Sequence, residues 1–181
     1  DIVSPPNRSS ISVVVFMNQR ILSDGKAVVQ IRDVLKEKFK YSSVAIYGDN
    51  QAKSPEFLEF AEKVRTDPAN EKNIEVVNIG ELAQYGQSIK SDYVILITIS
   101  PCNIYWREMT LFSNAQIRFD MKESVLVIDA ASNKYVEIIN YYKEGTSTRM
   151  VDGAKDLINQ LAANFNWSPP TEKPDDNQII N

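Results

Sequence analysis

The sequence predicts a single α/β domain of three layers, in which helices flank a mixed sheet of about seven strands. Two observations lead to this prediction. The first half of the chain alternates strand-like apolar runs with helical patterns, which is typical of parallel strands joined by crossover helices. From residue 110 onward, three strand-like runs follow one another with only turn residues between them, which is typical of an antiparallel meander. The domain is expected over 11–167, between a flexible tether at 1–10 and a flexible tail at 168–181.

The first half is predicted to contain four strands and two clear helices. Residues 11–17 form an almost continuous apolar run, as expected for a strand covered on both faces. Val28, Ile31 and Leu35 recur at helical spacing, and Ser54 followed by Pro55 is a strong helix start. In chain order we expect a strand at 11–17, a helix at about 26–40, a strand at 43–47, a helix at about 55–66, a strand at 74–79, at most a short helix at 81–85 and a strand at 93–99.

The second half is predicted to be an antiparallel meander that is closed by a helix. Its three strands are expected at 110–119, 122–130 and 134–142, with a hairpin connection at 120–122. Apolar residues at helical spacing then predict a helix over about 150–164.

The composition excludes several classes of function. The chain of 181 residues has a net charge of −4 and no basic run, so we expect no nucleic-acid partner. It has no histidine, which removes Ser-His-Asp and Cys-His nucleophile chemistry and the commonest zinc ligand. The single cysteine, Cys102, is interpreted as a small buried hydrophobic residue. We therefore expect no enzyme activity, no catalytic residues, no cofactor and no metal site.

The loops that follow the first two strands are where an open α/β sheet would place a ligand. The first continues from Met17 through an Asn-Gln-Arg segment, and the second follows Tyr47 with a Gly-Asp-Asn segment. Neither contains a glycine-rich phosphate-binding motif. Asp24 and Asp49 are acids in loops and are interpreted as turn residues rather than cation ligands. A flavodoxin-like small-molecule or nucleotide-binding module that uses these loops is the alternative function.

A partner-binding segment is predicted between the two halves of the chain. Tyr105, Trp106 and Arg107 stand together there, and these three residue types are favoured at interface hot spots. The alternative is that the segment folds over the sheet edge and Trp106 fills a gap in the core.

The second half also carries short motifs of a known group of proteins. Residues 91–94 read Ser-Asp-Tyr-Val, 127–129 read Val-Ile-Asp at a strand end, and 132–134 read Ser-Asn-Lys in a turn. This pattern resembles envelope lipoproteins built on the fold shared by CsgG-like proteins and TolB amino-terminal domains. The chain departs from it in lacking the glycine that commonly follows the first motif and any counterpart of membrane-inserting hairpins. The resemblance implies a non-catalytic envelope domain that binds other proteins.

Together these observations predict a non-catalytic cell-envelope protein, a lipoprotein-type interaction or assembly domain. Its expected partners are other envelope proteins or a second copy of itself. The chain starts at Asp1 rather than Met, as a mature exported protein or a piece of a longer protein would. Export to the periplasm or cell surface is expected, with membrane contact only through a lipid anchor upstream of Asp1.

Overall fold

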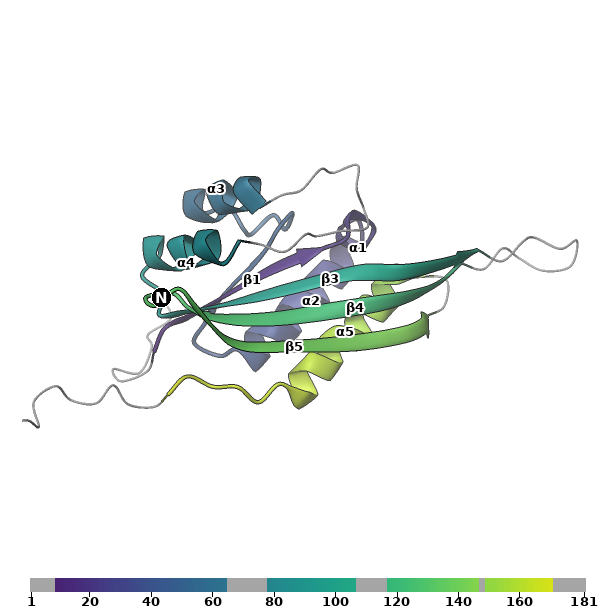
Figure 1. Cartoon of the computed structure of the whole chain (residues 1–181). Helices are drawn as coiled ribbons and strands as arrows, with labels where there is room; N and C mark the ends of the chain where they lie inside the picture. The colour runs from purple at the N-terminus through teal and green to yellow at the C-terminus, as the bar shows by residue number, and fades with distance from the viewer. Residues whose placement is uncertain (1–8, 65–77, 107–116, 147–148, 171–181) are drawn as a thin grey trace, which may run out of the picture.

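The fold is built on one open sheet of five strands in the order β2-β1-β3-β4-β5 (Figure 1). The computed structural model describes residues 9–64, 78–106, 117–146 and 149–170. The strands are β1 (Ile11–Met17), β2 (Ser43–Ile46), β3 (Tyr93–Trp106), β4 (Ile117–Asp129) and β5 (Lys134–Thr146). Strand β1 runs parallel to β2 and β3, whereas β4 is antiparallel to both β3 and β5. The mixed α/β class is confirmed, but the described residues form five strands and not about seven.

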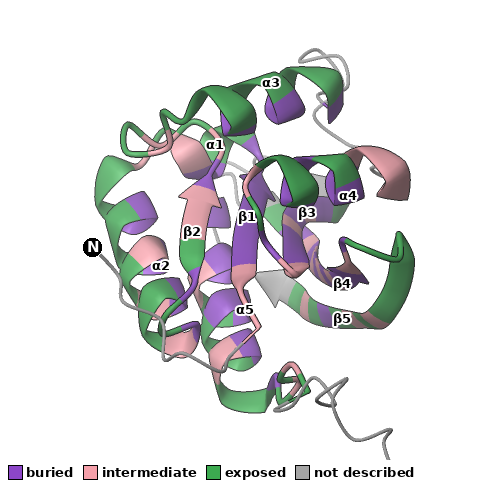
Figure 2. Cartoon of the chain, turned by 90° about the vertical axis from the view of Figure 1, so that its left-hand side faces the viewer, coloured by how far each residue is buried: buried purple, intermediate pink, exposed green. Residues whose placement is uncertain are grey.

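Helices cover both faces of the sheet, although unequally. They are α1 (Gln19–Leu22), α2 (Gly25–Lys38), α3 (Pro55–Val64), α4 (Ile79–Ser88) and α5 (Met150–Asn164). Helices α2 and α5 pack on one face, and α3 and α4 pack on the other (Figures 1 and 2). The α3–α4 layer lies over β1 and the start of β3, so the far parts of β4 and β5 carry no described helix on that face.

Strand β1 shows why its sequence is apolar at nearly every position. Val13 and Val15 are fully buried in the core formed with α2 and α5. Val14 and Phe16 point the other way, into the core formed with α3 and α4. Successive side chains of a strand alternate between faces, so a strand covered on both sides needs apolar residues throughout. The prediction for residues 11–17 is confirmed.

The predicted hairpin at 120–122 is wrong, because β4 is one continuous strand from Ile117 to Asp129. Phe119 and Met121 are buried on the α5 side, while Lys122 is paired with Tyr142 of β5 on the other face. Asp120 and Lys122 are thus the outward residues of an ordinary two-residue alternation. Their polarity reflects a partly uncovered sheet face and not a turn.

Strand β3 continues seven residues beyond the predicted end at 99 and passes through Pro101. Its pairing with β1 ends at Ile99, so a residue without an N–H group is tolerated beyond that point. The register against β4 shifts between Pro101 and Asn103. Cys102 falls within this bulge and is exposed, which corrects the interpretation of its thiol as buried.

The stretch after α3 also differs from the prediction. Ile79, expected at the end of a strand, begins the ten-residue helix α4, and residues 74–77 lie outside the described residues. The Asn78 side chain accepts a hydrogen bond from the Gly80 amide and thereby caps the helix. The helix expected at 81–85 is therefore longer than predicted. Most of the predicted tether and tail, residues 1–8 and 171–181, also lies outside the described residues.

Gly86 allows α4 to approach the sheet closely. A Cβ atom at this position would lie 2.7 Å from Val94 Cγ2 and 2.8 Å from Ala130 Cβ. We predict that Gly86→Ala lowers the free energy of unfolding by about 1–3 kcal/mol, because the helix must move away from β3 and from the turn after β4. Urea denaturation checks this value.

Gly25→Ala is the matched control, since no atom lies within 4 Å of a Cβ added to Gly25. This substitution at the start of α2 is expected to leave stability unchanged or to raise it by up to about 1 kcal/mol. Equal stabilities for the two variants would contradict the close packing at Gly86.

Candidate functional site

The side chains after β1 and β2, where a ligand was considered, take part in holding the fold. Asn18 Oδ1 accepts a hydrogen bond from the Arg20 amide at 2.9 Å and caps α1. Asp49 Oδ2 accepts one from Arg32 Nη1 at 2.7 Å, and both of these side chains are largely buried. An ion pair that is shielded from water in this way connects α2 to the end of β2. The Asp49 carboxylate is therefore already committed to a structural contact.

Asp24 has a similar structural role. Its Oδ1 accepts a hydrogen bond from the Ala27 amide at 3.1 Å, and its Oδ2 lies 2.8 Å from Arg149 Nη2. The hydrogen bond from Ala27 and the charge of Arg149 lower the pKa of this carboxyl below its usual value. Asp24 thus caps α2 and ties it to the start of α5. The described part of the chain contains no group of three or more His, Cys, Asp or Glu side chains placed to hold a metal ion.

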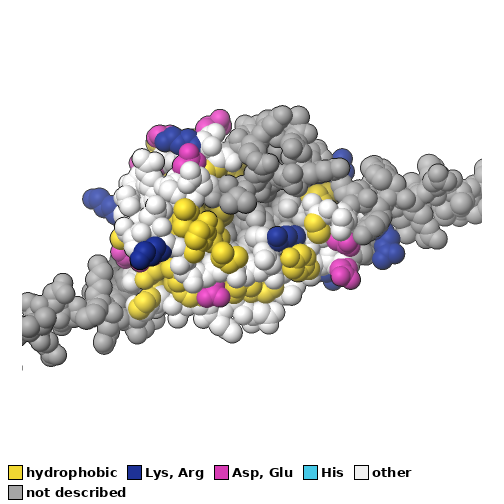
Figure 3. Space-filling view, viewed as in Figure 1, with side chains coloured by type: hydrophobic (Ala, Val, Ile, Leu, Met, Phe, Trp, Pro, Cys, Tyr) yellow, Lys and Arg dark blue, Asp and Glu magenta, His cyan; other side chains and the backbone are white. Residues whose placement is uncertain are grey.

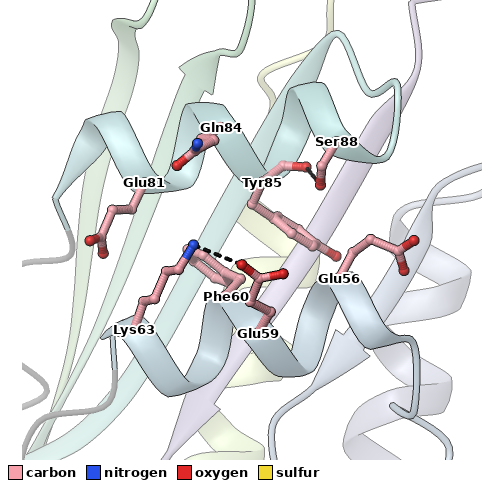
Figure 4. A pocket seen from close by; sticks show the side chains of 8 residues that line it. All are labelled: Glu56, Glu59, Phe60, Lys63, Glu81, Gln84, Tyr85 and Ser88. Atoms are coloured by element: carbon pink, nitrogen blue, oxygen red, sulfur yellow. Dashed lines mark hydrogen bonds and ion pairs between the residues drawn. The ribbon is translucent and has the colours of Figure 1, made fainter.

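A shallow groove of about 150 Å³ lies between α3 and α4 (Figure 4). Its lining residues are Glu56, Glu59, Phe60, Lys63, Glu81, Gln84, Tyr85 and Ser88. Lys63 Nζ pairs with Glu59 Oε1 at 2.9 Å, and the Tyr85 ring stacks on Phe60 with centroids 4.8 Å apart.

The tyrosine in the groove does not supply a base near neutral pH. Burial, reinforced by the charge of Glu56, raises the pKa of Tyr85 to about 12, so its hydroxyl stays protonated at neutral pH. The groove is acidic, and the stacked rings of Phe60 and Tyr85 join α3 to α4. We interpret it as part of the packing of α3 on α4.

The most unusual side chain in the molecule is Glu123, which the sequence analysis did not single out. It is fully buried in the middle of β4, paired with Ile99 on one side and Tyr141 on the other. Neither of its carboxyl oxygens has a hydrogen-bond partner among the described residues. Removal from water raises the pKa of Glu123 to about 9, so the group is neutral at physiological pH. The detectable signal was an acid at a position where alternate residues of the strand are apolar.

Several exposed apolar side chains of the described residues lie on the sheet itself. We call the open face the side of β4 and β5 opposite α5, where Leu126 pairs with Ile138 and Lys122 pairs with Tyr142. Ile138 is 60% exposed and Tyr142 is 57% exposed. Figure 3 shows hydrophobic side chains gathered along this side of the sheet. Tyr135 and Val136, at the start of β5, are exposed as well.

The predicted partner segment lies at the end of β3. Tyr105 pairs with Arg118 and Trp106 pairs with Ile117, so these two residues extend the sheet and do not form a linking loop. Arg107 lies outside the described residues. The role of Tyr105, Trp106 and Arg107 in binding stays a prediction. The structure instead identifies Tyr142 as an exposed aromatic residue, whereas the adjacent Tyr141 is buried on the α5 side.

Comparisons with known proteins give matches only among solved structures. No protein-family model matches the chain, and no curated protein matches it. The lipoprotein GNA1162 from Neisseria meningitidis is 15% identical with a TM-score of 0.41, over 86% of this chain and 99% of that one. The PelC dodecamer from Paraburkholderia phytofirmans is 13% identical with a TM-score of 0.40, over 89% of each chain. A neuraminyllactose-binding hemagglutinin homologue from Helicobacter pylori is 10% identical with a TM-score of 0.36, over 90% of this chain and 84% of that one.

Glu123 makes the stability of the protein depend on pH in a direction opposite to that of a paired carboxylate. Its pKa is about 9 in the folded state, against 4.5 for a glutamate in water. The folded state therefore holds the proton more tightly, and the contribution of Glu123 is complete below pH 4.5 and lost as the pH rises toward 9. We predict that the wild type loses about 1.4 kcal/mol per pH unit relative to Glu123→Gln between pH 6 and 8.

Urea denaturation of both proteins across this pH range measures the difference. Glu37→Gln removes a carboxylate that is 75% exposed and controls for loss of charge alone. Parallel curves for the wild type and Glu123→Gln would show that the buried carboxyl is not neutral in the folded protein.

Proposed function

We propose that this chain is a non-catalytic interaction or assembly domain of the cell envelope, which binds other proteins through the open face of β4 and β5. The observation that carries the proposal is the exposure of Ile138 and Tyr142 on a sheet face that the described helices cover only in part. Apolar side chains that remain in contact with water in this way are typical of protein-binding surfaces. A tyrosine adds a large, rigid contact with a polar end, which suits an interface.

We propose the absence of catalysis because the polar side chains near the sheet are either paired with one another or enclosed in the core. Asp24 and Asp49 are each paired with an arginine, and each contributes to the attachment of α2. Glu123 has a raised pKa but is fully enclosed, so no substrate can reach it without a rearrangement of the core. The chain contains no histidine to act as a base near neutral pH.

The envelope location is proposed on the resemblance to CsgG-like and TolB amino-terminal domains. Two of the residues that carry it have clear structural roles. Asp92 Oδ2 accepts a hydrogen bond from the Ser10 amide at 2.9 Å and fixes the entry to β1. Asn133 has a φ of 55°, the left-handed conformation that the usual glycine of this turn would adopt. The described residues contain no helix of the length and apolar character needed to span a bilayer. Anchoring by an upstream lipid belongs to the same proposal.

The small-molecule alternative receives less support. It requires the loops after β1 and β2 to offer free polar groups, whereas Asp49 is held by Arg32 and the Asn18 side chain caps α1.

Site-specific crosslinking in the native cells tests the proposed surface. We predict that a photoreactive residue at Lys122, on β4 within the open face, forms a discrete adduct with another protein, because a bound partner would lie over it. The same residue at Leu58 is the control, since Leu58 is 44% exposed but belongs to α3. No adduct at Lys122, or the same adducts at both positions, would count against this surface.

A further inference from the structure

The two edge strands of the sheet differ greatly in length. Edge strand β2 has 4 residues, whereas edge strand β5 has 13. Short edges, prolines and bulges are the usual means by which proteins prevent further strand pairing. Strand β5 contains no proline, and no strand among the described residues pairs with its outer side. The outer backbone groups of β5 thus form a long template for one more strand.

The part of β5 that pairs regularly with β4 is centred on Asn140. Its register against β4 shifts at both ends, between Val127 and Ile128 of β4 and between Phe119 and Met121. Between these shifts the pairing is unbroken from Glu137 to Lys143, and the midpoint of this segment is Asn140. A partner strand would pair best along this regular segment, because bulges disturb the ladder on either side of it.

This segment is complementary to itself when two copies run antiparallel about Asn140. Glu137 of one copy then lies opposite Lys143 of the other, and both side chains are on the α5 side of the sheet. Ile138 lies opposite Tyr142 on the open face. Ile139 lies opposite Tyr141 on the α5 side. Two-fold symmetry repeats each pair, so the interface contains two opposite-charge pairs and four apolar pairs.

We propose that β5 pairs with β5 of a second copy of this chain, about a two-fold axis at Asn140, and joins two five-stranded sheets into one continuous sheet. This inference rests on the proposed function, in which the region binds proteins, and it identifies one such protein as a second copy of the chain. The open face then continues across the axis, with Ile138 and Tyr142 of both copies on either side of the two Asn140 side chains.

Neighbouring registers fit less well. An axis at Ile139 would place Ile138 opposite Asn140 and Glu137 opposite Tyr141. An axis at Tyr141 would place Ile138 opposite Glu144 and Ile139 opposite Lys143. Of these three registers, only the axis at Asn140 places opposite charges together and apolar residues together along the regular segment. Lys143 already lies 3.3 Å from Asp156 of α5 but is 44% exposed, which leaves room for a second carboxylate.

Light scattering during size-exclusion chromatography of the full chain tests the inference. The wild type is expected to show a concentration-dependent mass that approaches twice the chain mass of 20.5 kDa. Glu137→Lys places like charges opposite one another at both ends of the interface and should raise the dimer Kd at least about tenfold. The double variant Glu137→Lys/Lys143→Glu exchanges the charges and should restore dimerisation. Leu58→Ser, on α3, should leave the mass unchanged.

Two results would overturn the inference. One is a wild type that remains monomeric at about 1 mM, where even a weak specific dimer would be populated. The other is a dimer that Glu137→Lys leaves intact or that the double variant does not restore. The two proposals fail separately, because the Lys122 crosslink reports on the open face and not on the outer edge of β5. A monomer that still gives a Lys122 adduct with a different protein would retain the proposed function and reject the self-pairing.

Discussion

The pairing of β3 with both β1 and β4 is the constraint on which the rest of the structure depends. Strand β3 is parallel to β1 over Tyr93–Ile99 and antiparallel to β4 over its full length. Ile95 and Ile97 are fully buried on the α2–α5 side, and Val94 is fully buried on the α3–α4 side. The strand thus joins a parallel sheet that needs helices on both faces to an antiparallel extension that needs them on one.

The asymmetry of the two faces follows from this arrangement. Helix α5 packs beneath β4 and β5 and buries several of their α5-side residues, including Glu123 and Tyr141. On the other side, α3 and α4 reach only the start of the extension (Figure 1). The sheet therefore presents Ile138 and Tyr142 to solvent beside a long free edge. A buried neutral carboxyl beneath that surface couples the stability of the same strands to pH.

The sequence predicted correctly those elements in which the spacing of apolar residues follows a single period. Strand β1 and helices α2, α3 and α5 were predicted because their apolar residues follow one clear period over a whole element. It failed for 120–122, because an outward Asp and Lys in a strand with one open face resemble a turn. Helix α4 was underestimated because Gly80 and Gly86 look like helix ends, although Gly86 is needed for close packing on β3. The free edge of β5 depends on strand order and helix placement, which no local pattern reveals. The burial of Glu123 depends on them too, and its only local signal is an acid among alternating apolar residues.

Hydrogen exchange as a function of protein concentration tests most directly whether β5 is a binding edge. The backbone amides of 137–143 are expected to exchange more slowly as concentration rises, because half of them face an edge that becomes paired. Amides of β2, at the opposite edge, should exchange at a constant rate. If the exchange of 137–143 does not depend on concentration while the protein is otherwise folded, β5 does not bind a second copy.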